Sequence, residues 1–201
     1  MSMSLSKQAK VLTSKQSDLV LNYLSTTRSP LRNQLIFLLS TKAGLRAKEI
    51  ASLQWAMVLD SDGEVSNYIH LTNTVSKGHS GGREIPLNKQ LKSILIEYHQ
   101  LVSSSRYFNP NNNLIHTQRS QSTSPQAIVN MFQGWYKDLN LLGCSSHSGR
   151  RTFITNCSRK ITTVGGSLRD VQYLAGHSSL QTTQRYIEGN SESKVKVVDL
   201  V

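Results

Sequence analysis

Between residues 56 and 87 the spacing of apolar residues changes from a helical period to a period of two, and this change most limits the fold. The stretches MVLD, YIHLTNT and REIPL alternate apolar with polar residues, and the turn sequences SDGE and KGHSGG separate them. They predict three short antiparallel strands. The rest of the chain has helical spacing, so we expect a mainly α fold with a small three-stranded antiparallel sheet (α+β).

Residues that favour helix termini mark where several predicted helices begin and end. Pro30 stands near the start of one helix and Gly44 where its C-terminal cap would lie. Gly176 separates two short helices near the C-terminus. The predicted helices cover 13–25, 29–44, 45–55, 87–104, 124–143, 145–160, 167–177 and 179–187.

The charge balance indicates a polyanionic partner. The chain has 201 residues, with 23 Lys and Arg against 12 Asp and Glu, a net charge of +11. Such an excess points most simply to nucleic acid, although acidic membranes also attract basic proteins. No apolar run is long enough to span a bilayer, and the N-terminus lacks the apolar core of a secretory signal. We therefore expect a cytoplasmic protein that does not associate with membranes.

Several familiar chemistries lack their sequence motifs in this chain. It contains no GxxxxGK[ST] loop, no GxGxxG after a strand and no HExxH. The clustered carboxylates lie in LDSDGEV, at Asp60, Asp62 and Glu64, a composition typical of a tight turn. Cys144 and Cys157 lack the neighbouring ligands that a zinc site needs. We expect no metal and no cofactor.

A set of cationic and proton-transferring side chains fits one chemical task, the nucleophilic attack on a phosphodiester without metal. Guanidinium groups bind the non-bridging oxygens of a phosphate bidentately. A tyrosine can attack if a base or positive surroundings activate it, and a lysine or histidine can protonate the leaving oxygen. Each side chain alone is more often structural, but together they favour this chemistry. The set comprises Arg46, Glu49, Lys77, His147, Arg150, His177 and Tyr186.

Four segments resemble, in order, the sequence boxes of the tyrosine recombinases, the phage integrase family. AGLRAKEIASLQW resembles the first arginine box and TVSKGHSGGREIPL the lysine-bearing hairpin. HSGRRTF resembles the HxxR box, and LAGHSSLQTTQRY the box that joins the second histidine to the nucleophile. The resemblance implies site-specific DNA recombination (DNA integration) through a 3′-phosphotyrosyl intermediate, without metal or ATP.

The resemblance also implies a role for each matching residue. Tyr186 would be the nucleophile, and Arg46 and Arg150 would grip the scissile phosphate. Lys77 would act as the general acid toward the leaving 5′ oxygen.

The remaining family positions are two histidines and an acidic residue. His147 would assist proton transfer from the tyrosine, and His177 would hydrogen-bond the phosphate. Glu49 matches the acidic position that orients the arginine–histidine pair. One departure is Gly149, where the family usually has leucine, and glycine could loosen the helix that places the second arginine.

Double-stranded DNA is the partner that the charge and the resemblance imply. We expect a monomer in isolation and a tetramer on paired DNA sites. Further basic residues should contact the DNA backbone, which makes binding strongly salt-dependent. These predicted contacts are Arg83, Lys89, Lys92, Arg119, Arg151, Arg159, Lys160 and Arg185.

The expected organisation is one catalytic domain over residues 13–190, between a basic tail at 1–12 and a tail at 191–201 that docks on a neighbouring protomer. Most relatives carry an upstream helical domain. The chain therefore resembles either an isolated catalytic domain or a short member such as the fimbrial phase-switch recombinases. Two alternatives stay open, a type IB topoisomerase that relaxes supercoils and a DNA-binding regulator of the same fold that does not cleave.

Overall fold

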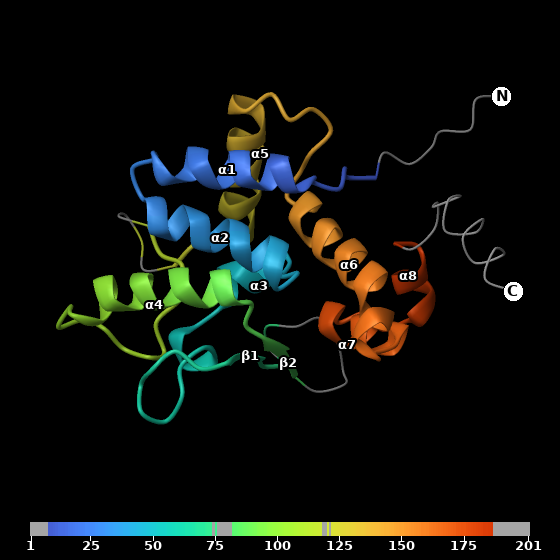
Figure 1. The fold of residues 1–201 in the computed structure, drawn as a ribbon. Coiled ribbons are helices and arrows are strands. Elements are labelled where there is room, and N and C mark those ends of the chain that lie inside the picture. The colour runs from blue at the N-terminus through green and yellow to red at the C-terminus, as the bar shows by residue number, and fades with distance from the viewer. Residues whose placement is uncertain (1–7, 74, 76–81, 118–119, 121, 187–201) are drawn as a thin grey trace, which may run out of the picture.

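The structure is a computed structural model, and it describes residues 8–73, 75, 82–117, 120 and 122–186 (Figure 1). The described part is mainly helical with a small antiparallel sheet, as predicted. The helices are α1 (Ser14–Ser25), α2 (Pro30–Lys42), α3 (Ala47–Ser52), α4 (Lys89–Ser103), α5 (Pro125–Asp138), α6 (Ser148–Lys160), α7 (Leu168–Ala175) and α8 (Leu180–Gln184). The strands are β1 (Tyr68–Leu71) and β2 (Arg83–Pro86), and two 3₁₀ turns cover Trp55–Met57 and Ile161–Val164.

Helix α2 is the centre of the molecule. Every residue from Leu35 to Thr41 is buried, so the helix has no face left for solvent along this stretch. A helix that is apolar on all sides must be covered on all sides. Helices α1, α4 and α6 pack around it, with α1 above it, α4 below it and α6 to its right in Figure 1.

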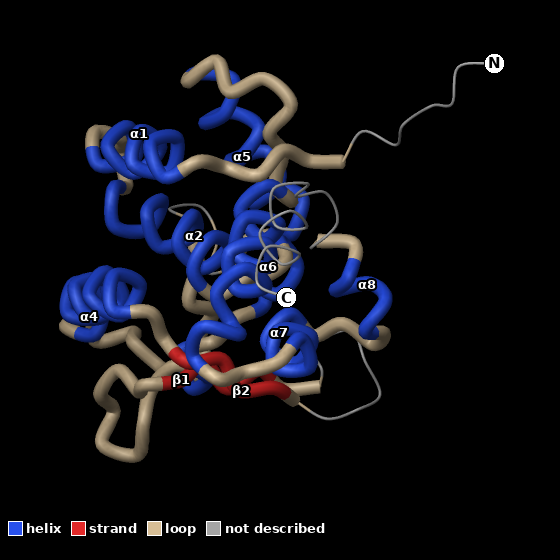
Figure 2. Tube along the Cα trace, turned by 45° about the vertical axis from the view of Figure 1, so that its right-hand side comes forward, coloured by secondary structure: helices blue, strands red, loops and turns tan. Residues whose placement is uncertain are grey.

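The apolar interior has two parts. The larger core gathers around α2 and includes residues of α1, α3, α4, α5 and the sheet. The smaller core joins α6 to α7 through Phe153, Ile154, Val171 and Ala175. Helices α6, α7 and α8 therefore form a C-terminal layer that packs on α2 (Figure 2).

The sheet among the described residues has two strands, not the three that the sequence predicts. Strands β1 and β2 pair in antiparallel register, with Tyr68 opposite Pro86 and Leu71 opposite Arg83. The predicted first strand, MVLD, instead begins in the 3₁₀ turn that carries the buried Trp55 indole, and it keeps one isolated bridge between Leu59 and Val65. A 3₁₀ turn lacks the extended backbone that a strand needs, so this segment cannot extend the ladder.

The acidic cluster forms the predicted turn. The Asp60 carboxylate accepts hydrogen bonds at 3.0 Å from the backbone N–H groups of both Asp62 and Glu64. Gly63 adopts a positive φ of 80° in the same turn. The carboxylate thus stabilises the turn by accepting hydrogen bonds from its backbone, as Asp commonly does at such positions.

Two glycines end helices as predicted, and one predicted end is wrong. Gly44 follows α2 with a φ of 67°, and Gly176 caps α7 with a φ of 59°, conformations that favour glycine. Helix α5 ends at Asp138, not at Gly143, because Asn140 already adopts the left-handed conformation. Asparagine is the residue other than glycine that most readily does so.

Gly149 allows close contact between α6 and α2. A Cβ atom at this position would lie 2.4 Å from Oγ and 2.9 Å from Cβ of Ser40. The leucine that the family pattern leads us to expect would therefore collide with α2. The glycine tightens the packing of α6 at this point instead of loosening it.

We predict opposite effects for alanine at the two glycines within helices. Gly149→Ala should lower the free energy of unfolding by about 1–3 kcal/mol, because it overpacks the contact with α2. Gly134→Ala should raise it by about 0.5–1 kcal/mol, because alanine favours helix and a Cβ at Gly134 meets nothing within 4 Å. Urea unfolding measures both values. Equal stabilisation by the two variants would contradict the packing argument, and Ser40→Gly should partly rescue Gly149→Ala.

Candidate active site

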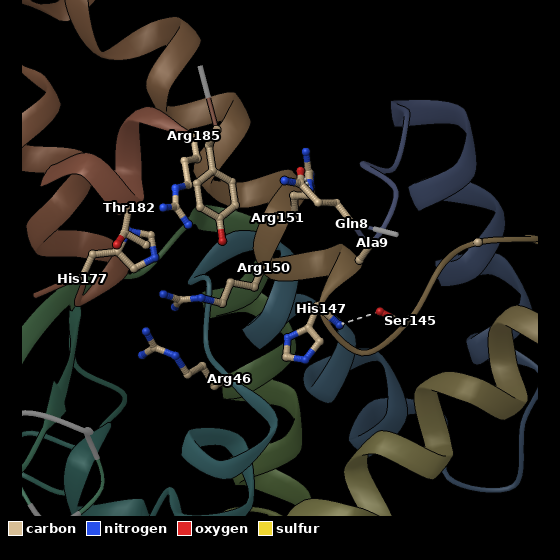
Figure 3. Close-up of a pocket in the computed structure, with 12 residues that line it drawn as sticks. Gln8, Ala9, Arg46, Ser145, His147, Arg150, Arg151, His177, Thr182 and Arg185 are labelled. Atoms are coloured by element: carbon tan, nitrogen blue, oxygen red, sulfur yellow. Dashed lines mark hydrogen bonds between the residues drawn. The ribbon is translucent and has the colours of Figure 1, made fainter. Parts of the chain in front are cut away.

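A cavity of about 550 Å³ lies where the C-terminal layer meets α3 and the segment before α1. Its wall includes the first turn of α6 and the chain on either side of α8 (Figure 3). Five of the predicted catalytic residues line it, namely Arg46, His147, Arg150, His177 and Tyr186. Gln8, Ala9, Arg151, Thr182 and Arg185 complete much of the wall.

Arg150 is buried in the first turn of α6 and is held by the ends of two other helices. Its Nη1 donates to the Gly44 carbonyl at 2.5 Å, and its Nη2 donates to the Ala175 carbonyl at 2.6 Å. These carbonyls lie at the C-terminal ends of α2 and α7, where helix dipoles favour a positive charge. Burial, followed by the charge of Arg46, lowers the pKa of Arg150 to about 10, so it remains protonated near neutral pH.

Arg46 precedes α3 and extends in the same direction as Arg150, beneath His177 (Figure 3). Its Nη1 donates to Oε1 of Glu49 at 3.1 Å, and its Nη2 donates to the Gly176 carbonyl at 3.3 Å. The side chain keeps 32% of its surface exposed. The structure thus brings two guanidinium groups to one side of the cavity, and one of them stays open to an incoming anion.

Arg83 corrects a prediction, because it is not a surface contact for DNA. The side chain is 6% exposed, and its Nη1 and Nη2 donate to Oε1 and Oε2 of Glu49 at 3.0 and 3.1 Å. Along β2 the residues alternate, so Arg83 faces inward together with Ile85. This shared side of the strand is visible in the sequence and could have revealed the burial.

Glu49 orients two arginines. Its Oε2 also accepts the backbone N–H of Arg46 at 2.8 Å, the contact of an acidic residue in the first turn of a helix. Burial by itself would raise the pKa of the Glu49 carboxyl. The hydrogen bonds and charge of Arg83, then those of Arg46, outweigh burial and lower the pKa. Glu49 thus pairs with Arg46 and Arg83, whereas Arg150 is bound by backbone carbonyls, so the cavity keeps an excess of positive charge.

His177 directly follows the Gly176 cap, and its ring is neutral near neutral pH. Burial and the charges of Arg150, Arg46 and Arg83 lower its pKa to about 4. Nδ1 lies 2.9 Å from Oγ1 of the buried Thr183. When the threonine hydroxyl donates to Nδ1, the ring proton lies on Nε2, where it can donate to a phosphate oxygen. Thr183 is a site residue that the sequence pattern missed.

Tyr186 lies between a histidine and an arginine. Its ring stacks on His177 with centroids 5.6 Å apart and an interplanar angle of 24°. The guanidinium carbon of Arg151 lies 5.8 Å from the ring centroid, which is the distance of a cation–π contact. Arg151 also donates from Nη1 to Oε1 of Gln8, so the segment before α1 reaches the same wall.

His147 directly precedes α6 as its N-cap residue and is exposed. Its backbone N–H donates to Oγ of Ser145 at 3.3 Å, and its imidazole enters the wall of the cavity (Figure 3). The positive end of the α6 dipole lies at this first turn, which favours an anion there.

The other predicted residues are not all part of the cavity. Lys77 and Arg119 lie outside the described residues. Lys89 is exposed at the start of α4, and the Lys92 Nζ donates to Oδ1 of Asn67 at 2.7 Å. Arg159 and Lys160 are exposed at the end of α6, whereas Arg151 and Arg185 line the cavity.

No group of three His, Cys, Asp or Glu side chains in the described part of the chain could hold a metal ion. Cys144 and Cys157 are free thiols. None of the described helices combines the length and the apolar character that a bilayer span requires.

Comparison with known proteins gives a consistent set of matches. The sequence profile of the phage integrase family matches residues 10–193. Tyrosine recombinase XerC of Herpetosiphon aurantiacus is 26% identical over 190 residues, which cover 93% of this chain and 58% of that protein. The chain spans a little over half the length of the curated relatives it matches.

Solved structures share the fold. The Tn1549 transposon integrase, in complex with a circular intermediate DNA, matches with a TM-score of 0.75 and 19% identity, covering all of this chain and 68% of that one. The XerA recombinase matches with a TM-score of 0.72 and 20% identity, covering 94% of this chain and 64% of that one.

The depressed pKa of His177 predicts a titration far from that of an ordinary imidazole. Its Hε1 resonance should titrate near pH 4 and not near 6.5. Because the folded pKa lies below the unfolded one, folding stability should be complete above about pH 6.5 and should decrease as the pH falls to about 4. His177→Asn should weaken this dependence. An NMR titration that gives His177 an apparent pKa near 6.5 would contradict its buried position beside the three arginines.

Proposed function

The chain belongs to the phage integrase family, and on that premise we propose that it cuts and rejoins double-stranded DNA at specific sites, one strand at a time, through Tyr186. One observation carries the proposal: a single positively charged cavity is lined by Tyr186, His177 and His147 together with the guanidinium groups of Arg46 and Arg150. The names of the relatives, tyrosine recombinases XerC and XerD, support recombination over supercoil relaxation or binding without cleavage.

In the proposed cleavage step the Tyr186 oxygen attacks the phosphorus of the scissile phosphodiester. A bond forms between phosphorus and the phenolic oxygen, and the bond from phosphorus to the 5′ oxygen breaks. The phenolic proton leaves to a base, and the 5′ oxygen takes up a proton. The product is a 3′-phosphotyrosyl bond and a free 5′-hydroxyl. One phosphoester bond replaces another, so the reverse step rejoins DNA without ATP.

Arg46 and Arg150 are proposed to bind the non-bridging oxygens as negative charge develops on them. Backbone carbonyls already hold both guanidinium groups, and Glu49 holds that of Arg46, so little reorganisation is needed when the phosphate arrives. Preorganised donors of this kind commonly supply a large share of a rate enhancement. The neutral His177 adds a hydrogen bond from Nε2, because Thr183 occupies Nδ1.

Two residues are proposed to move protons. A tyrosine is a weak nucleophile near neutral pH, so it needs a base or positive surroundings. His147 lines the same cavity and is proposed to assist proton transfer from Tyr186. Lys77, which lies between β1 and β2 in the sequence, is proposed as the acid that protonates the leaving oxygen.

The proposed substrate and assembly follow from the reaction. Site-specific exchange needs two DNA sites, so we propose a monomer in isolation and a tetramer on paired sites, acting in the compartment that holds the DNA. The exposed Lys89, Arg159 and Lys160 and the cavity residue Arg185 would contact the backbone. Such contacts release counterions, which makes affinity fall as salt rises. Residues 13–190 would form the catalytic domain.

Tyr186→Phe tests the proposed nucleophile. With supercoiled plasmid in EDTA, followed by a detergent stop, the unaltered protein should relax the plasmid and remain covalently attached to DNA. Tyr186→Phe removes only the attacking oxygen, so attachment should vanish while DNA binding persists. Tyr107→Phe is the matched control, because Tyr107 is an exposed tyrosine outside the cavity. Covalent attachment that survives in Tyr186→Phe would contradict the proposal.

Deletion of residues 191–201 tests the proposed docking of the C-terminal tail on a neighbouring protomer. The shortened chain should bind a single DNA site as before, because the cavity residues remain. Assembly on paired sites should weaken, which sedimentation velocity on DNA duplexes can measure. Assembly identical to that of the full chain would rule the docking out.

A further inference from the structure

Arg83 occupies an unusual place for an arginine. It is the first residue of β2, and its guanidinium is buried against the Glu49 carboxylate with two parallel hydrogen bonds. Arg46 makes a single side-chain hydrogen bond to the same carboxylate and sends its other terminal nitrogen to the Gly176 carbonyl. The buried Arg83 therefore makes the bidentate contact with Glu49, and the partly exposed Arg46 makes the weaker, single contact.

Stability alone does not explain this arrangement. A buried ion pair contributes little net stability, because removing two charges from water costs about as much as their attraction returns. The Arg83 Nε has no hydrogen-bond partner within the described part of the chain, which adds a further cost. Apolar side chains at both position 83 and position 49 would avoid both costs. The charge of Arg83 therefore calls for a functional explanation.

Arg83 also touches the segment that carries His177. A Cβ atom at Gly176 would lie 2.4 Å from the Arg83 Nη1, so the glycine leaves room for this guanidinium as well as forming the helix cap. The next residue of the strand, Glu84, donates its backbone N–H to the Tyr173 hydroxyl of α7 at 3.2 Å. The beginning of β2 is thus fixed to both α3 and α7.

We propose that Arg83 is a positioning residue for DNA cleavage, which neutralises Glu49 so that Arg46 keeps its charge and its orientation for the phosphate. Without Arg83 the buried carboxylate would be left with one cation, and a two-pronged pair with Arg46 would satisfy it best. Arg46 would then be turned toward Glu49 and neutralised. The inference rests on the proposed function, since it assigns a further residue to the same reaction.

The test compares Arg83→Met, Arg83→Lys and the double variant Arg83→Met with Glu49→Gln. Arg83→Met should slow covalent cleavage by roughly 10- to 100-fold, by analogy with the loss when a residue that orients a metal ligand is removed. Noncovalent DNA affinity should hardly change. The double variant removes the unbalanced carboxylate together with its partner, so it should cleave about tenfold faster than Arg83→Met. Arg83→Lys keeps the charge but lacks the planar guanidinium that makes two parallel hydrogen bonds. Its cleavage rate should lie between those of Arg83→Met and the unaltered protein.

Arg106→Met is the matched control for the lost charge, because Arg106 is exposed and contacts Tyr107 outside the cavity. It should cleave like the unaltered protein. A slower cleavage at unchanged DNA affinity is the readout that a purely structural role would not give, and the His177 resonance reports the charge at the site. Its pKa should rise above about 4 in Arg83→Met, because one of the charges that lower it is gone.

Two cleavage results would overturn the proposal. One is a rate for Arg83→Met equal to that of the control, and the other is a double variant no faster than the single one. If Arg83→Met does not fold, the double variant decides alone, since its interior holds no unbalanced charge. Cleavage within about tenfold of the control then supports the proposal, and a larger loss overturns it.

Failure of the proposed function is distinguishable from failure of this inference. If the unaltered protein never attaches to DNA, the proposed function fails, and binding of inorganic phosphate followed by the His177 resonance tests Arg83 instead. Arg83→Met should then bind phosphate about tenfold more weakly, the effect of losing one charge-assisted contact, and the double variant should recover affinity. Equal affinity in all variants would overturn the inference.

Discussion

The binding of the Arg150 guanidinium by two backbone carbonyls, one just after α2 and one at the end of α7, is the interaction on which the site depends. Arg150 comes from α6, Gly44 follows α2, and Ala175 ends α7, so one side chain ties the central helix to the C-terminal layer. The negative ends of two helix dipoles compensate a charge that burial and the α6 N-terminus disfavour. The cavity can therefore hold a cation that remains charged and needs no carboxylate of its own.

The same two chain reversals also deliver the neighbouring site residues. Gly44 turns the chain after α2, and Arg46 follows two residues later at the start of α3. Gly176 turns the chain after α7, and His177 follows at once. Each reversal offers a carbonyl to a guanidinium and then places a functional side chain beside it. Both glycines adopt a positive φ and leave space for a neighbouring side chain, as the close approach of Arg83 to Gly176 illustrates.

Much of the fold could be predicted from the sequence, because helix caps and apolar spacing are local signals. The breaks at Gly44 and Gly176 and the turn at Asp60 are of this kind. The third strand was wrong because a tertiary contact, the entry of Trp55 into the core, overrides the local alternation. The predicted end of α5 is wrong because Asn140 adopts the left-handed conformation three residues before Gly143.

For the site, the residue types and their order in the sequence indicate which side chains line the cavity. They do not indicate which of these side chains contact one another. The charge of Arg83 suggests an exposed contact, but its place on the inward side of β2 indicates burial. Thr183 and the helix-end carbonyls carry no motif, since any residue supplies a carbonyl. The sequence predicts that Gly149 loosens α6, and only the approach of Ser40 shows that it tightens the contact with α2.

The most direct test of the account is to find where the DNA is attached. The protein would be trapped on a nicked duplex whose cleaved strand cannot rejoin, digested with trypsin and nuclease, and analysed by tandem mass spectrometry. Trypsin cuts after Arg185 and Lys194, so residues 186–194 form one peptide that also contains two serines. The account predicts a nucleotide on the Tyr186 oxygen. A nucleotide on either serine, or on any peptide elsewhere in the chain, would contradict it.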